Sequence, residues 1–255
     1  MALPLSRSRV VEEFAGFPFL DINFRAGRLL TAVACTRWAR AHGLDQAPEA
    51  AQLQSTLQPA EARRIRALDL ALDLPTEDLT SEQQERAAGC LARTRELIPE
   101  WAPLLSIPVR LHQLVHSEAV SASVFAWPQY VFLGEAAFSS DANLTEQLVH
   151  EHSHQWLYFI EELWPLAAGE DRWVLPSGTA HRSTSELLGA VHVVVNLHRL
   201  WQRTDVDSHT RERRLLDLAA YGRDCLPLLA AARPGLTSEG AALADRLRRE
   251  VSGWS

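Results

Sequence analysis

The chain has 255 residues, of which 47 % are hydrophobic and 22 % are charged, as in a folded globular protein. Its formal net charge of −7 at pH 7 argues against nucleic acid or an anionic membrane as a partner, because both attract basic surfaces. Cys35, Cys90 and Cys225 form no CxxC pair, and a cytoplasmic location is expected. There is neither an apolar signal-peptide run nor the ~18 apolar residues that span a bilayer.

The first hundred residues show helical patterns. Apolar positions follow helical spacing from Phe24 to about Ala41, and Gly43 ends that segment. Residues 60–73 are expected to form a second helix, and a third helix is expected from Thr80 toward Pro99 or Trp101. We therefore expect this first part of the chain to be wholly helical.

The pattern changes after Pro108, where short segments alternate and are rich in β-branched and aromatic residues. VRLHQLV and VSASVFAW predict two strands, and QYVFLG predicts a further strand that Pro128 separates from them. The segment RWVLP is compatible with a strand or an extended loop. A small sheet is therefore expected in the middle of the chain.

The remainder of the chain is predicted to be mainly helical. Asp141, Asn143 and Thr145 offer N-cap side chains for a long helix through about Ile160. A capping box, Ser183 to Glu186, begins a helix that runs to about Arg203. Two amphipathic helices are expected near 208–232 and 237–250. The predicted fold class is α+β, predominantly helical, with a small sheet packed against the helix that begins near Asp141.

That helix carries the sequence His150-Glu151-His152-Ser153-His154, which is an HExxH motif. Residues four apart lie one turn above each other, so His150 and His154 can bind one cation. Glu151 lies about 100° further round the helix and can reach an open position of the metal. His152 points away and is predicted to be a packing or surface residue. The alternative is a polar helix face with ordinary histidines.

A third ligand is needed to hold the ion firmly, and His192 is the strongest candidate because it lies within an apolar helical segment. The alternative for His192 is a buried histidine bonded to a carbonyl group. Glu186 is a competing carboxylate, but it is expected to serve the helix cap. We predict a single domain over 1–255, with a helical part to about 104 and a metal-binding part over about 105–255.

Three further side chains are candidates for the surroundings of the metal. Tyr158, four residues after His154, can support the ligands, although a core tyrosine is the alternative. Arg199 lies seven residues after His192 on the same helix face, and Arg182 precedes that helix. Either guanidinium can bind a carboxylate bidentately, although a solvated surface arginine is the alternative for both.

The segments LVHEHSHQWLY and LLGAVHVVVNLHRLW resemble the HExxH-motif proteins associated with α-ketoglutarate-dependent β-hydroxylation of amino-acid residues. The resemblance covers roughly residues 125–205. It implies that His150, His154 and His192 bind iron and that Arg199 binds the co-substrate carboxylate, because Gly189, His192 and Arg199 match the family's spacing. The family often carries an Arg-Pro pair where this chain has Ser185-Glu186, so Arg182 is a substitute anchor.

Two metal chemistries follow from these observations. The leading hypothesis is a mononuclear Fe(II) and α-ketoglutarate-dependent oxygenase that uses O2 to hydroxylate the β-carbon of an amino acid, free or within a peptide. The alternative is a zinc-dependent peptidase or amidase in which Glu151 is the general base. A non-catalytic binding module is a third hypothesis. The sequence is silent on oligomeric state.

Overall fold

A computed structural model describes residues 8–43, 47–59 and 75–254. The chain divides into two compact units, one made of the segments up to Arg25 and after Leu163, and the other of Ala26–Leu163. The fold is predominantly helical with a small mixed sheet, which confirms the predicted α+β class. The single domain stays a prediction.

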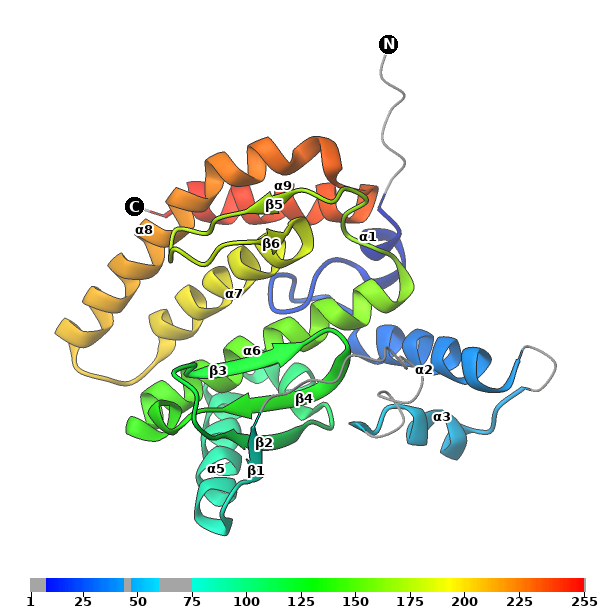
Figure 1. Ribbon diagram of the computed structural model, residues 1–255, viewed down its shortest axis with the longest axis horizontal. Coiled ribbons are helices and arrows are strands. Elements are labelled where there is room, and N and C mark those ends of the chain that lie inside the picture. Colours follow the sequence, from blue (N-terminus) through cyan, green and yellow to red (C-terminus); the bar gives the residue numbers. More distant parts are fainter. Residues whose placement is uncertain (1–7, 44–46, 60–74, 255) are drawn as a thin grey trace. The chain divides into compact units, whose positions relative to one another are not determined.

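The unit Ala26–Leu163 contains the helix of the HExxH motif and a four-stranded sheet (Figure 1). Its helices are α2 (Ala26–His42), α3 (Ala50–Thr56), α5 (Ser81–Leu97) and α6 (Asp141–Leu163), with short 3-10 turns at Pro99–Trp101, Leu104–Ser106 and Glu135–Ser139. Its strands are β1 (Thr76–Asp78), β2 (Arg110–Leu114), β3 (Ser121–Val124) and β4 (Trp127–Leu133).

The strand order in the sheet is β1-β2-β4-β3, so β3 is an edge strand. Strand β4 runs parallel to β2 and antiparallel to β3. The predicted strands after Pro108 are confirmed, but the first part of the chain is not wholly helical, because β1 pairs with β2. Pro128 also lies within β4 instead of before it. The helix predicted at 60–73 lies outside the described residues.

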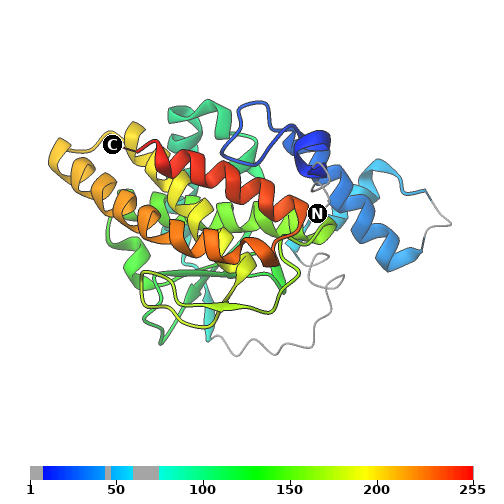
Figure 2. The same cartoon turned by 90° about the horizontal axis from the view of Figure 1, so that it is seen from above.

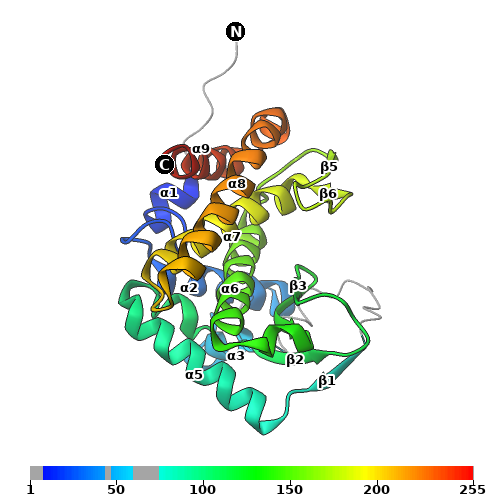
Figure 3. The same ribbon diagram turned by 90° about the vertical axis from the view of Figure 1, so that its left-hand side faces the viewer.

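Helix α6 packs against the sheet and against α5 (Figures 1 and 3). Val131 and Leu133 of β4 share a buried cluster with Leu144 and Leu148 of α6, and this apolar burial stabilises the unit. The amide of Gln155 adds a polar link, because it accepts from the backbone N of residue 129 at 2.5 Å and donates to the carbonyl of residue 130 at 3.1 Å. These contacts fix which face of α6 turns toward the strands.

The other unit consists of three long helices and a two-stranded sheet. Its elements are α1 (Arg9–Phe14), β5 (Arg172–Trp173), β6 (Arg182–Ser183), α7 (Thr184–Arg203), α8 (Ser208–Ala232) and α9 (Ser238–Ser252). Figure 2 shows α8 and α9, in orange and red, lying against each other. The predicted capping box of α7 is confirmed, since the hydroxyl of Ser183 accepts from the Glu186 backbone N–H while the Glu186 carboxylate accepts from the Ser183 N–H.

Gly240 lets the start of α9 approach the backbone after α6, because a methyl group there would collide with the carbonyl oxygen of Leu166. We expect Gly240→Ala to destabilise the protein by about 1–3 kcal/mol, the usual cost of overpacking. The matched control is Gly27→Ala in the first turn of α2, where a Cβ would meet nothing within 4 Å and an exposed substitution should change stability by less than about 0.5 kcal/mol. Urea unfolding of both variants measures the difference, and equal effects would contradict the close approach.

Candidate metal site

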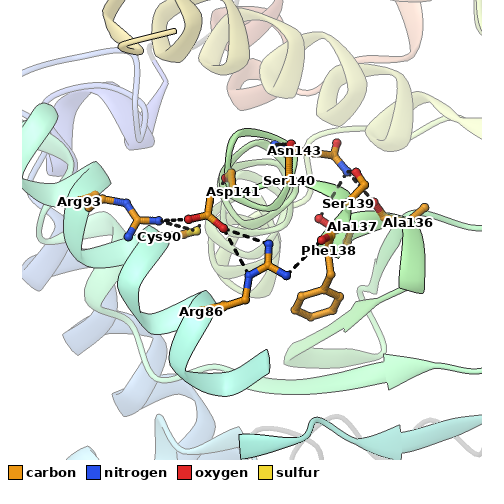
Figure 4. A network of polar contacts seen from close by, with 10 residues as sticks. All are labelled: Arg86, Cys90, Arg93, Ala136, Ala137, Phe138, Ser139, Ser140, Asp141 and Asn143. Atoms are coloured by element: carbon orange, nitrogen blue, oxygen red, sulfur yellow. Dashed lines mark hydrogen bonds and ion pairs between the residues drawn. The ribbon is translucent and has the colours of Figure 1, made fainter. Parts of the chain in front are cut away.

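The start of α6 is held by a polar network (Figure 4). Arg86 and Arg93 of α5 contact the carboxylate of Asp141, with closest distances of 2.9 Å and 2.8 Å. The hydroxyl of Ser140 accepts from the backbone N–H of Asn143 at 3.1 Å. Ser140 is therefore the capping side chain, and the prediction that residues 141–145 supply the cap is wrong. Asp141 instead links α6 to α5 and suits the positive end of the helix dipole.

His150 and His154 lie on the same face of α6, as the spacing of the motif predicts. Their ring centroids are 5.0 Å apart and their planes are inclined by 57°. The side chain of His150 is 35 % exposed and that of His154 is partly buried. Both imidazoles are thus accessible, and they are close enough for one ion to contact a nitrogen of each with small rotamer changes.

Glu151 is 1 % exposed and lies beside this pair, with its Oε1 3.8 Å from His150 Nε2. The hydroxyl of Ser121 on β3 donates to Oε1 at 2.6 Å. Within the described residues, Oε2 is buried and has no hydrogen-bond partner. Burying a carboxylate oxygen without a partner costs free energy. We therefore expect this atom to contact a cation, a proton or a water molecule.

Tyr158 continues the same helix face one turn beyond His154. The two rings are stacked at an angle of 19°, with centroids 6.1 Å apart. The Tyr158 hydroxyl donates to the backbone carbonyl of Ser123 at 3.3 Å. Edge strand β3 therefore runs along this face of α6, from Ser121 beside Glu151 to Ser123 beside Tyr158.

His152 does not belong to this face, and of the two predicted roles, packing or surface, it has the packing role. It is fully buried, and its Nδ1 lies 2.7 Å from the carbonyl oxygen of Leu148. Burial disfavours the imidazolium and lowers the pKa of His152 to about 4, against the opposing effect of the Leu148 carbonyl. His152 is therefore a neutral core side chain at pH 7.

His192 lies on α7, in the other unit, and it is fully buried. Its Nε2 is 2.9 Å from the carbonyl oxygen of Pro18, which can only accept, so Nε2 carries the hydrogen. Burial lowers its pKa to about 4, while the bond to Pro18 opposes the shift. This is the arrangement expected of a buried histidine bonded to a carbonyl, and metal ligation by His192 stays a prediction.

The two predicted carboxylate anchors are both engaged by protein groups. Arg199 donates to the carbonyls of Phe19 and Leu20 at 2.7 Å and 3.0 Å, and it pairs with Glu250 at 2.9 Å. Arg182 pairs with Glu186 at 2.6 Å. Partial burial raises the pKa of Glu186, but hydrogen bonds from Ser183 and Arg182 outweigh it, so the net pKa is lowered. Glu186 acts as the predicted cap residue.

The structure therefore brings together His150, His154, Glu151 and Tyr158, while His192, Arg199 and Arg182 lie in the other unit. Among the described residues, no group of three or more His, Cys, Asp or Glu side chains has a geometry that could hold a metal ion. Ser121 was missed by the sequence reasoning, because it lies 30 residues before Glu151 and a serine in a short strand carries no local signal.

The long helices of the described segments include none with the length and hydropathy to cross a membrane. Comparison with known proteins adds no family: no protein-family model matches the chain, and no curated protein matches it.

Proposed function

We propose that the chain is a mononuclear metalloenzyme whose ion is bound by His150 and His154. The observation that carries the proposal is the pair of adjacent imidazoles beside Glu151, whose buried Oε2 has no partner within the described residues. A divalent cation could bind both imidazoles, and a water molecule on that cation could reach the carboxylate oxygen. The pair of histidines therefore suits a metal, and it leaves coordination positions for reactants.

For the chemistry, we propose a β-hydroxylase dependent on Fe(II) and α-ketoglutarate. The support is the resemblance of the two motif segments, including the spacing of Gly189, His192 and Arg199. Iron and α-ketoglutarate would supply the oxidation, in which one atom of O2 enters a substrate C–H bond and the other enters succinate as CO2 leaves. The role of Glu151 would be to orient His150, and that of Tyr158 to orient His154.

The proposal requires His192 and Arg199 of the other unit to change their polar partners. His192 Nε2 must give up its hydrogen and its bond to Pro18 to become a ligand, and Arg199 must exchange carbonyl or Glu250 contacts for a co-substrate carboxylate. The first exchange leaves the Pro18 carbonyl without its donor, and that cost must be offset by metal binding.

A peptide is favoured over a free amino acid as the substrate by the position of β3. This strand pairs only with β4 within the described sheet, so its second edge carries backbone groups without a strand partner. Val120 and Phe125, immediately before and after β3, are each 37 % exposed. An extended peptide could pair with this edge and place its side chains on those apolar residues, with its backbone passing beside His154.

A zinc-dependent peptidase or amidase is the second candidate, and the position of Glu151 favours it. Glu151 is adjacent to the histidine pair, and Ser121 holds one of its oxygens, while the other has no hydrogen-bond partner within the described residues. A carboxylate so placed could accept a proton from a water molecule that enters beside the metal. This reaction needs the α6 residues, whereas the oxygenase also needs Arg199 or Arg182 for its co-substrate.

Metal analysis and optical spectroscopy test the two chemistries. Protein purified without added metal is expected to contain iron, and anaerobic addition of Fe(II) and α-ketoglutarate should produce a weak visible charge-transfer band. With air, mass spectrometry of candidate peptides should show the gain of one oxygen. Tight zinc with no such band would overturn the oxygenase.

The same assay can use Glu151→Gln to separate the candidates further. A hydrolase should lose about 10²–10⁴-fold in rate when its general base is removed, whereas an oxygenase should retain part of its activity. The binding-module hypothesis survives only if neither hydroxylation nor hydrolysis is detected.

A further inference from the structure

An open cleft of about 420 Å³ lies between α1, with the loop that follows it, and one face of α9. We call it the α1–α9 cleft. One wall carries Val11 and Phe17, and the other carries the stripe Ala242, Asp245, Arg246 and Arg249, which are spaced as neighbours on one helix face. All of these residues belong to the unit that lacks the HExxH helix, so the cleft is separate in sequence and in fold from the candidate metal site.

The loop at the base of the cleft has a backbone that few residues adopt. Ala15 and Gly16 have φ values of 59° and 121°, and a Cβ on Gly16 would collide with the Asp21 carboxylate. That carboxylate accepts from the backbone N–H of Phe17 at 2.8 Å. Such sparsely populated backbone conformations persist only where surrounding contacts hold them. The loop therefore forms a well-defined wall of the cleft.

Both acidic side chains that line the cleft already have cationic partners. Asp21 pairs with Arg246 at 3.2 Å. Asp245 pairs with Arg233 at 2.6 Å and with Arg248 at 3.3 Å. Their negative charge is therefore largely compensated, and neither of them would strongly repel an anion that enters the cleft.

The two arginines that line the cleft differ in whether protein groups already bind their guanidinium groups. Arg246 is fully engaged, since it also donates to Glu250 and to the carbonyl oxygen of Leu20. Arg249 is exposed, and no described residue forms a hydrogen bond or ion pair with it. Its guanidinium is thus the cation of this cleft that is available to a ligand.

The charges around the cleft add up to a local positive excess. Its lining side chains and their direct ion-pair partners comprise four arginines and three acids, which gives a net charge of +1. These are Arg233, Arg246, Arg248, Arg249, Asp21, Asp245 and Glu250. The whole chain carries −7, so this cleft is a place where an anion is attracted to an otherwise acidic protein.

We propose that the α1–α9 cleft binds a small organic carboxylate, with the carboxylate on Arg249 and a short apolar group against Val11. A guanidinium recognises a carboxylate through paired hydrogen bonds. Val11 is 45 % exposed although it is apolar, and an alkyl group would cover it. The volume of the cleft suits a ligand of this size.

Isothermal titration with hexanoate tests this site, and Arg249→Gln is the decisive variant. Wild-type protein should bind hexanoate saturably, and Arg249→Gln should weaken binding by about 10-fold or more, as expected for the loss of a charge-assisted hydrogen bond. The matched control is Arg223→Gln, which removes the same charge from an exposed position of α8 that neither lines the cleft nor pairs with a lining residue. It should change the affinity less than about 2-fold.

Two comparison ligands, hexanamide and inorganic phosphate, test whether the site needs the charge and the carboxylate of hexanoate. Hexanamide has the same apolar group without the charge and should bind at least about 10-fold more weakly than hexanoate. Absence of saturable hexanoate binding, equal losses in both arginine variants, or equal affinity for hexanamide would each overturn the proposal. Phosphate binding as tight as hexanoate would overturn the assignment to an organic carboxylate. Circular dichroism melts check that both variants are folded.

Discussion

His154→Ala is expected to abolish stoichiometric metal binding while leaving the fold intact. Its imidazole is one of only two histidines that face each other on α6, with ring centroids 5.0 Å apart, so its removal leaves a single nitrogen ligand there. The affinity should fall by more than the roughly 10–100-fold that loss of an outer partner of a ligand costs. Because His154 is only partly buried, the change in stability should be small. Metal content after gel filtration measures the effect, and His150→Ala should behave in the same way.

The control for both variants is His209→Ala, which removes an exposed histidine near the start of α8 and should leave the metal content unchanged. Adventitious binding to surface histidines would instead reduce the metal content equally in all three variants. If His154→Ala kept the wild-type metal content, the proposed site on α6 would be wrong.

The predicted third ligand needs a variant that keeps the core intact. His192→Gln places an amide N–H where Nε2 lies, so the bond to the Pro18 carbonyl can persist. If His192 binds the metal, this variant should lose metal as His154→Ala does, with little change in melting temperature. Metal content equal to the wild type would remove His192 from the ligand set and leave its structural role.

The sequence predicted the local features of the site because these depend on residues that are near one another in the chain. The HExxH spacing placed two imidazoles on one helix face, and the Ser183–Glu186 capping box marked the start of α7. Both signals span at most one helical turn. In these two cases local backbone geometry is sufficient to set the arrangement, so the pattern is kept in the folded protein.

Features that depend on distant partners were not predictable. The hydrogen bond between Ser121 and Glu151 joins residues that are 30 apart in the chain. Neither a serine nor a glutamate indicates such a contact in the sequence. Strand β1 was missed because Thr76–Asp78 contains two acidic residues with low strand propensity, and pairing with β2 stabilises it. Ser140, not Asp141, caps α6 because two arginines of α5 engage the Asp141 carboxylate. In each case tertiary contacts determined the local structure, and local propensity did not indicate it.

The largest expected loss of stability follows from breaking the buried ion pair between Arg37 and Glu162, which are 125 residues apart in the chain. Arg37 of α2 donates to both carboxylate oxygens of Glu162 on α6, at 2.9 Å and 2.7 Å, and both side chains are fully buried. Its remaining nitrogen donates to the side chain of Gln129 and to the carbonyl of Thr56. Arg37→Met keeps the volume but leaves the Glu162 charge buried and unpaired, which costs about 3–5 kcal/mol. Urea unfolding measures the loss.

Whether this pair contributes net stability is a separate question from the cost of breaking it, because burying two charges also carries a desolvation penalty. Arg37→Met combined with Glu162→Leu removes both charges, and it should therefore be less destabilising than Arg37→Met alone. Arg233→Gln, which breaks an exposed pair with Asp245, should cost less than about 1 kcal/mol. If Arg37→Met were as mild as Arg233→Gln, the pair would be solvated in solution, and α2 would hold the end of α6 through apolar contacts and the bond from Arg40 to the Glu162 carbonyl.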